Sequence, residues 1–76
     1  MSLFGVKQEV SIEGMKCEHC AAHMKEAFEK VDGVKDCKVD LEKKVAIVKS
    51  KNGLSLEEAK KTVESCNKTF LGIKNL

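Results

Sequence analysis

The sequence predicts an α+β fold in which two helices pack on one face of a four-stranded antiparallel sheet. Hydrophobic and polar residues alternate in the run 6–13, a pattern typical of a half-buried strand, and the runs 34–41 and 44–50 are rich in β-forming residues. Two further runs, beginning near residues 18 and 55, carry apolar residues at helical spacing. With a last short apolar run, the order along the 76-residue chain is strand, helix, strand, strand, helix, strand.

The first strand and the first helix are separated by a short loop. One face of the strand carries Val6, Gln8, Val10 and Ile12. Gly14 ends the strand, and from Glu18 the apolar spacing becomes helical. The stripe that we expect to face the core consists of Ala21, Met24, Phe28 and Val31. Residues 32–34 stop the helix, and Gly33 is the expected C-terminal cap.

The middle of the chain predicts a β-hairpin. The polar residues 42–44 form a turn between two runs rich in β-branched residues. One face of the first run carries Cys37, Val39 and Leu41, and one face of the second carries Val45 and Ile47.

The second helix begins with a complete N-terminal signature. Ser55 is followed three residues later by Glu58, which is a capping box, and Leu54 stands in the position of a hydrophobic staple. Asn67 is the expected helix stop, and residues 69–73 read as the final strand. The apolar stripe of this helix consists of Leu56, Ala59, Val63 and Cys66. Right-handed crossovers between elements in this order give the ferredoxin-like βαββαβ arrangement.

Length and composition indicate one small soluble domain, residues 1–76, with its core at about 6–74. A hydrophobic content of 42% and a charged content of 34% exclude a disordered chain. A net charge of +2 and three aromatic residues argue against nucleic-acid binding. No run approaches the roughly 20 apolar residues of a membrane span, and no secretory signal opens the chain. We therefore expect a cytoplasmic protein with reduced cysteines.

The candidate functional site is the pair Cys17 and Cys20, in the segment GMKCEHC. This spacing turns both sulfurs toward one point when the first cysteine lies in a loop and the second in the first helical turn. The helix N-terminus stabilises anions there and lowers thiol pKa values. Thiolates select soft ions such as Cu(I), Zn(II), Hg(II) and Cd(II). Two sulfurs suit a linear Cu(I) site, whereas a zinc site normally needs four ligands.

An enzyme is the alternative from a different functional class. A thiol–disulfide oxidoreductase would use Cys17 as its nucleophile. The chain has no proline, which usually lies between or near such cysteines in the thioredoxin type, and it is short for that fold. No set of acid, base and nucleophile is apparent, so we expect no enzymatic activity.

The segment GMKCEHC, after a strand and at the start of a helix, resembles the G-M-x-C-x-x-C signature of the heavy-metal-associated domain family. Residues 31–48, VDGVKDCKVDLEKKVAIV, are similar to the family's V-x-G-V-x-x-x-x-V-x-L stretch, and the likeness covers about residues 7–74. The family comprises small copper chaperones and the amino-terminal metal-binding domains of copper-transporting P-type ATPases.

This resemblance implies that Cys17 and Cys20 bind Cu(I) and that the cysteine pair of a partner takes the ion by ligand exchange. The implied partner is a copper-transporting P-type ATPase or its metal-binding domain. The resemblance also implies that Met15 packs under the loop rather than binding the ion. Alternatives of the same fold are a domain cut from such an ATPase and a carrier of Hg(II), Zn(II) or Cd(II).

Further residues are expected near the pair. The predicted topology places Cys66 beside the metal loop and Cys37 toward the opposite pole. Cys66 is a candidate third thiolate, or a contact in a metal-bridged dimer of an otherwise monomeric protein. Lys68 resembles the basic residue of eukaryotic-type chaperones and would offset the negative charge of a dithiolate–Cu(I) centre. His19 and His23 share one side of the helix at a spacing that can bind metal, although surface histidines are the expected interpretation; His19 is also a candidate for tuning metal entry.

Overall fold

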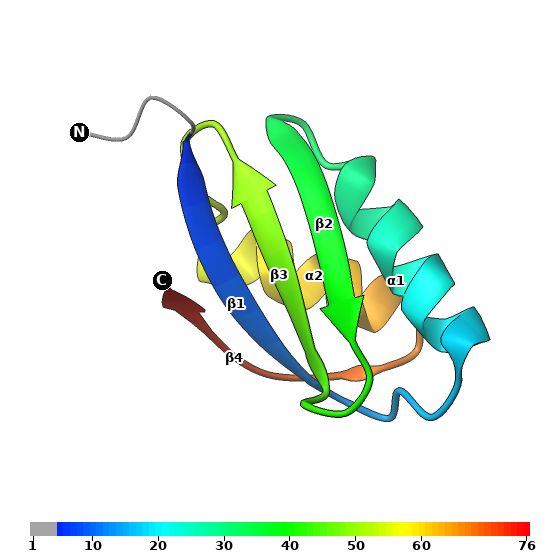
Figure 1. Cartoon of the computed structure of the whole chain (residues 1–76). Coiled ribbons are helices and arrows are strands. Elements are labelled where there is room, and N and C mark those ends of the chain that lie inside the picture. Colours follow the sequence, from blue (N-terminus) through cyan, green and yellow to red (C-terminus); the bar gives the residue numbers. More distant parts are fainter. Residues whose placement is uncertain (1–4) are drawn as a thin grey trace.

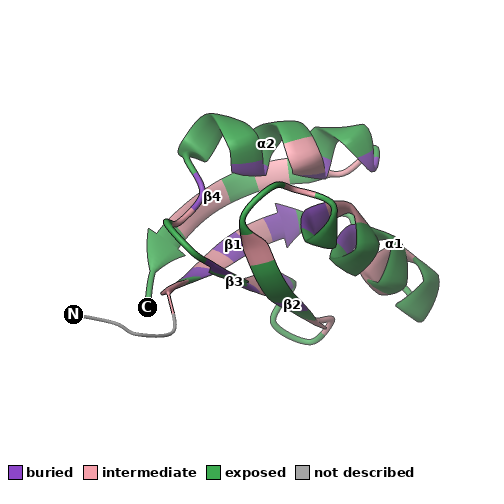
Figure 2. Cartoon of the chain, turned by 90° about the horizontal axis from the view of Figure 1, so that it is seen from above, coloured by how far each residue is buried: buried purple, intermediate pink, exposed green. Residues whose placement is uncertain are grey.

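The computed structural model describes residues 5–76, which form six elements in the predicted order (Figure 1). The four strands form one antiparallel sheet in the order β2-β3-β1-β4. Both helices cover the same face of this sheet (Figure 2). The predicted α+β, ferredoxin-like fold is confirmed. The elements are β1 (Val6–Glu13), α1 (Glu18–Glu29), β2 (Val34–Asp40), β3 (Val45–Ser50), α2 (Leu56–Ser65) and β4 (Thr69–Asn75).

The hydrophobic core lies between the sheet and the two helices. Its largest fully buried side chains are those of Phe28 and Met24 from α1 and Ile12 from β1. Cross-strand register extends this core across the sheet, because Val10 and Cys37 lie opposite Ala46 and Val48 of β3, respectively. Because Met24 and Phe28 are buried in this core, the face of α1 that carries them points toward the sheet.

The predicted apolar stripe of α2 is wrong at its first residue. Leu56 is 57% exposed, whereas Leu54, two residues earlier, is 7% exposed. Leu54 precedes the N-cap and fills the space under the start of the helix, so that Leu56 projects outward. The rest of the stripe, Ala59, Val63 and Cys66, is buried as predicted.

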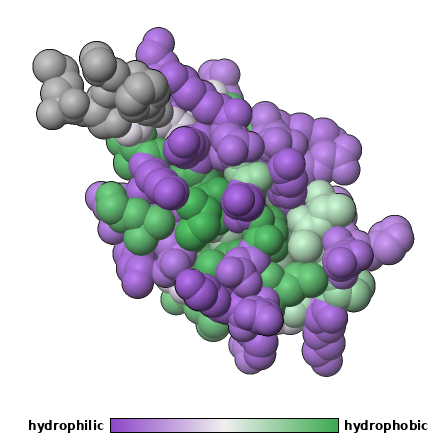
Figure 3. Space-filling model, viewed as in Figure 1, coloured by the Kyte–Doolittle hydropathy of each residue, from purple (hydrophilic) through white to green (hydrophobic). Residues whose placement is uncertain are grey.

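Val45 and Ile47 share a face of β3, but that face points away from the helices. The residues of β3 in the core are instead Ala46 and Val48. The outward face carries apolar side chains near its centre, surrounded by hydrophilic ones (Figure 3). The sequence pattern correctly predicted that Val45 and Ile47 share one face of β3. Packing of the helices decided which of the two faces of the strand lies in the core.

The first helix ends earlier than predicted. Glu29 is its last residue and Lys30 is the C-cap, so the expectation that Gly33 caps the helix is wrong. Gly33 has φ +90 and lies in the turn into β2, where its carbonyl accepts a hydrogen bond of 2.8 Å from the backbone of Lys51. Val31 lies beyond the helix but still packs against the core.

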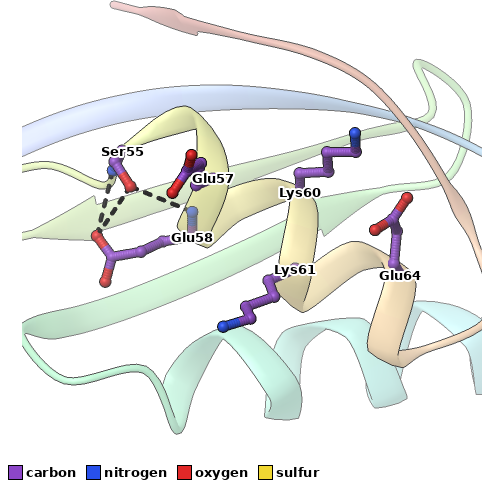
Figure 4. A pocket seen from close by; sticks show the side chains of 6 residues that line it. All are labelled: Ser55, Glu57, Glu58, Lys60, Lys61 and Glu64. Atoms are coloured by element: carbon purple, nitrogen blue, oxygen red, sulfur yellow. Dashed lines mark hydrogen bonds between the residues drawn. The ribbon is translucent and has the colours of Figure 1, made fainter.

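The predicted hairpin and capping box are both confirmed. Asp40 Oδ1 accepts hydrogen bonds from two backbone N–H groups of the hairpin turn, at 2.9 and 3.1 Å. At the start of α2, the backbone N–H of Glu58 donates to Ser55 Oγ at 3.1 Å, and the Glu58 carboxylate accepts from the backbone of Ser55 (Figure 4). Asn67, with φ +60, follows the helix as predicted.

A buried glutamine ties β1 to the start of α2. Gln8 is 6% exposed, and its Oε1 accepts a hydrogen bond of 2.6 Å from the backbone N–H of Leu54. Its Nε2 donates to the carbonyl of Leu54 and to Asn75 Oδ1, both at 3.1 Å. The side chain amide thus joins β1, β4 and the segment before α2 at the end of the domain opposite the cysteine loop.

The core assignment predicts unequal effects for two large apolar residues. We expect Phe28→Ala to lower the free energy of unfolding by about 3–5 kcal/mol, because it leaves a cavity between α1 and the sheet. Leu56→Ala is the control and should change it by less than about 0.5 kcal/mol, since this side chain is exposed. Urea denaturation followed by circular dichroism measures both. Equal losses in the two variants would contradict the observed packing.

Candidate metal centre

Two cysteines lie where the loop after β1 meets the start of α1, at one pole of the domain. Cys17 is the N-cap residue of α1, with an extended backbone, and its carbonyl accepts a hydrogen bond of 3.2 Å from the backbone of Ala21. Cys20 lies in the first helical turn. Their Sγ atoms are 3.7 Å apart and both thiols are free. The predicted placement, one sulfur in the loop and one on the helix, is observed.

The separation of the two sulfurs fits a single soft ion between them. A metal–sulfur bond of about 2.3 Å lets two thiolates up to about 4.6 Å apart contact the same ion. Cys17 is exposed and Cys20 is half-buried, so an ion held there would lie at the surface. Within residues 5–76, no three His, Cys, Asp or Glu side chains form a group that could hold a metal ion. Cys17 and Cys20 therefore form a candidate site with two sulfurs.

The surroundings of Cys20 lower the pKa of its thiol. The largest cause is a hydrogen bond from the backbone of Lys16, followed by the hydrogen bond with the Cys17 thiol. Partial desolvation opposes these effects, and the side chain of Lys68 adds to them. A lowered pKa leaves more thiolate near neutral pH, which is the form that binds soft metals. Sequence reasoning missed Lys16, because the pattern of side chains does not show where a backbone group will donate.

Lys68 crosses the loop beside the thiols. Its Cδ lies 3.4 Å from where a Cβ on Gly14 would stand, and Gly14 itself has φ +102. The side chain acts on Cys20 both as a hydrogen-bond donor and through its positive charge. The structure thus brings Lys68 from the far end of the sequence to the candidate site, as the predicted topology requires.

Met15 is buried beneath the exposed part of the loop. It is 3% exposed and belongs to the main hydrophobic core, whereas Gly14, Lys16 and Cys17 are exposed. This arrangement agrees with a packing role for the thioether. Burial of Met15 also holds the loop in place, because Met15 lies between Gly14 and Cys17.

The remaining two cysteines are buried. Cys66 is the C-cap of α2, is 6% exposed and lies in the core, with its Sγ 4.0 Å from Ser65 Oγ. Its role as a third ligand stays a prediction. Cys37 is 1% exposed, and desolvation raises the pKa of its thiol to about 12, with a smaller contribution from Glu29. A thiol with so high a pKa stays neutral at physiological pH.

The two histidines lie on the exposed side of α1. His19 and His23 both face solvent, one helical turn apart. Neither imidazole has a hydrogen bond or an ion pair with any residue in the part of the chain that the structure describes.

A surface depression along α2 lacks the chemistry of a site. Its volume is about 290 Å³, and Figure 4 shows that its walls come from the start and outer side of one helix. Positive and negative side chains alternate around it, and it contains no thiol or imidazole. The residues that line it are Ser55, Glu57, Glu58, Lys60, Lys61 and Glu64.

Among the helices of residues 5–76, none is long and apolar enough to cross a membrane.

Two proteins of similar sequence are named as copper chaperones. The chain is 50% identical over 44 residues to Copper chaperone CopZ of Enterococcus hirae, covering 58% of this chain and 64%, less than two thirds, of that protein. It is 33% identical over 60 residues to Copper chaperone CopZ of Staphylococcus haemolyticus, covering 78% of this chain and 88% of that protein.

A solved structure with a related fold comes from a transporter. It is the N-terminal domain of a potential copper-translocating P-type ATPase from Bacillus subtilis, in the Cu(I)-loaded state. The similarity has a TM-score of 0.76 at 25% identity and covers 91% of this chain and 90% of that one. The model of the Heavy-metal-associated domain matches residues 9–69, a segment that contains both exposed cysteines. This chain therefore belongs to the heavy-metal-associated domain family.

Proposed function

We propose that this protein is a metallochaperone that binds one Cu(I) ion between Cys17 and Cys20 and passes it to a partner protein. The observation that carries this proposal is the pair of free thiols, 3.7 Å apart, at the exposed start of α1. Thiolates prefer soft ions, and a two-sulfur set suits the low coordination number of Cu(I). The names of two relatives, both copper chaperones, support copper as the ion.

Release of the ion proceeds by ligand exchange. Binding of Cu(I) displaces one proton from each thiol of the pair, since the metal ligands are thiolates. A partner thiolate then enters a free coordination position and forms a three-coordinate intermediate. Cys17, the more exposed sulfur, leaves first, and the departing thiolates regain protons from solvent as the partner's second thiol loses its own. No bond is oxidised or reduced in this sequence.

The partner that fits this exchange presents a second cysteine pair of the same kind. We propose a copper-transporting P-type ATPase, or its metal-binding domain, and the similarity to such a domain from Bacillus subtilis supports it. We further propose that the protein works in the cytoplasm as a monomer, with a metal-bridged dimer as a transient form, and that it carries metal without catalysing a reaction. Lys68 offsets the negative charge of the dithiolate–Cu(I) centre.

Loss of either exposed cysteine should abolish tight Cu(I) binding. We expect Cys17→Ser and Cys20→Ser each to lose the ion to a competing chelator in an anaerobic titration, because one sulfur cannot retain it. Cys37→Ala is the matched control and should retain one Cu(I) per chain, since Cys37 is buried away from the loop. Parallel titrations with Zn(II), Hg(II) and Cd(II) test the choice of metal. Turnover of insulin disulfides without retention of Cu(I) would show an oxidoreductase instead.

Removal of the lysine charge should raise the pKa of Cys20. Lys68→Met removes both a hydrogen-bond donor and a positive charge, so a smaller fraction of Cys20 is thiolate at pH 7 and alkylation by iodoacetamide slows. The rate measured against pH, with the site located by mass spectrometry, gives the shift. Lys25→Met serves as the control on α1 and should leave the profile unchanged. If the dependence of the alkylation rate on pH is the same in Lys68→Met as in the native protein, Lys68 does not lower the pKa of Cys20.

The number of sulfurs on the ion tests the role of Cys66. We expect X-ray absorption of the Cu(I)-loaded monomer to give two sulfur neighbours in both the native protein and Cys66→Ala, because Cys66 is packed in the core. A third sulfur in the native protein that disappears in Cys66→Ala would identify Cys66 as a ligand. Sedimentation of the loaded proteins separates this result from a third sulfur donated by a second chain.

A further inference from the structure

We propose that His19 and His23 form a second metal site, on the exposed face of α1, that takes a borderline divalent ion such as Zn(II) or Cu(II). This site is distinct from the thiol pair in its atoms and in the ions that it prefers. It adds a function to the one proposed above and does not require the dithiolate to be occupied.

The spacing of the two histidines is that of a chelating pair. They stand at positions i and i+4 of the continuous helix Glu18–Glu29, so their side chains lie on one face, with Cβ atoms about 5–6 Å apart. In the H-E-x-x-H pattern, two histidines at this spacing on one helix face bind a zinc ion together with a further ligand. The three intervening residues are Cys20, Ala21 and Ala22, and the two alanines are small and leave room beside the rings.

Both imidazoles are available to an ion. His19 and His23 are exposed, and within residues 5–76 neither makes a hydrogen bond or an ion pair. Met24 and Phe28, on the opposite side of the helix, are fully buried, which prevents the helix from turning the histidines inward. A surface histidine with a structural role would be held by a partner, and these two are not.

The chemistry of the pair differs from that of the thiols. Imidazole nitrogen favours Zn(II), Cu(II) and Ni(II), whereas thiolates favour Cu(I). The two sites are close, because Cys20 and His23 are separated by about 4.5 Å along the helix axis. One helix can therefore carry a soft ion at its tip and a borderline ion on its side. Since no third protein ligand converges within residues 5–76, water completes the second site and the ion stays exchangeable.

The test uses the full chain with Cys17→Ser and Cys20→Ser, so that the exposed thiols cannot take the probe. Zn(II), which is redox-inactive, is titrated by calorimetry, and the ring resonances of both histidines are followed by NMR. We expect one Zn(II) per chain and simultaneous shifts of both rings. His23→Gln on the same background should raise the Kd at least about tenfold, because chelation by a second tethered donor is lost.

A matched control keeps the number of histidines and changes only their spacing. His23→Gln combined with Lys25→His places the second imidazole six positions from His19, off its face of the helix. Lys25 is exposed and makes only a surface ion pair of 3.8 Å with Glu29, so the helix tolerates the change. We expect this variant to bind as weakly as His23→Gln alone.

Several outcomes would overturn the second site. They are absence of binding in the parent, a shift of one ring only, and equally tight binding by the variant with altered spacing. Because the parent in this test lacks Cys17 and Cys20, none of these outcomes bears on Cu(I) binding at the thiol pair. Circular dichroism of each variant confirms that α1 is intact before the titrations are compared.

Discussion

Burial of Met15 is the constraint on which the exposed cysteine loop depends. The proposed function requires the segment between β1 and α1 to present two thiols to a partner, while its backbone is held in one conformation. Gly14 turns the chain with a positive φ, Met15 enters the core at 3% exposure, and Cys17 then caps the helix. The apolar contact of Met15 beneath the loop therefore helps to position the two thiols.

The electrostatics of the candidate site suit the proposed binding and release of an ion. Hydrogen bonds from Lys16 and Cys17, with the charge of Lys68, lower the pKa of Cys20 and favour the thiolate. The side chain of Cys17 itself is exposed. In the proposed function, an ion is held by its bonds to two sulfur atoms and is not enclosed by the protein. The buried Cys37 shows the opposite case, since desolvation raises the pKa of its thiol and keeps it protonated.

The opposite pole of the domain determines which residues reach the thiols. Gln8 joins β1 to the backbone of Leu54, and the capping box of Ser55 and Glu58 begins α2 directly after this contact. From this fixed start the helix runs back toward the cysteine loop. Its C-terminal end therefore brings Cys66 into the core near that pole and Lys68 onto Gly14. Hydrogen bonds far from the candidate site thus help to place Lys68, one of the groups that lower the pKa of Cys20.

The sequence by itself determined the order of elements, the hairpin, the capping box and the C-x-x-C pair, because each depends on residues close together in the chain. It did not determine which face of β3 is covered, that Leu54 rather than Leu56 fills the core, or that Gly33 serves the turn into β2. Nor could it show that the backbone of Lys16 acts on Cys20. Only the tertiary structure decided these points, because alternation and helical spacing define faces, whereas burial depends on which distant element packs against each face.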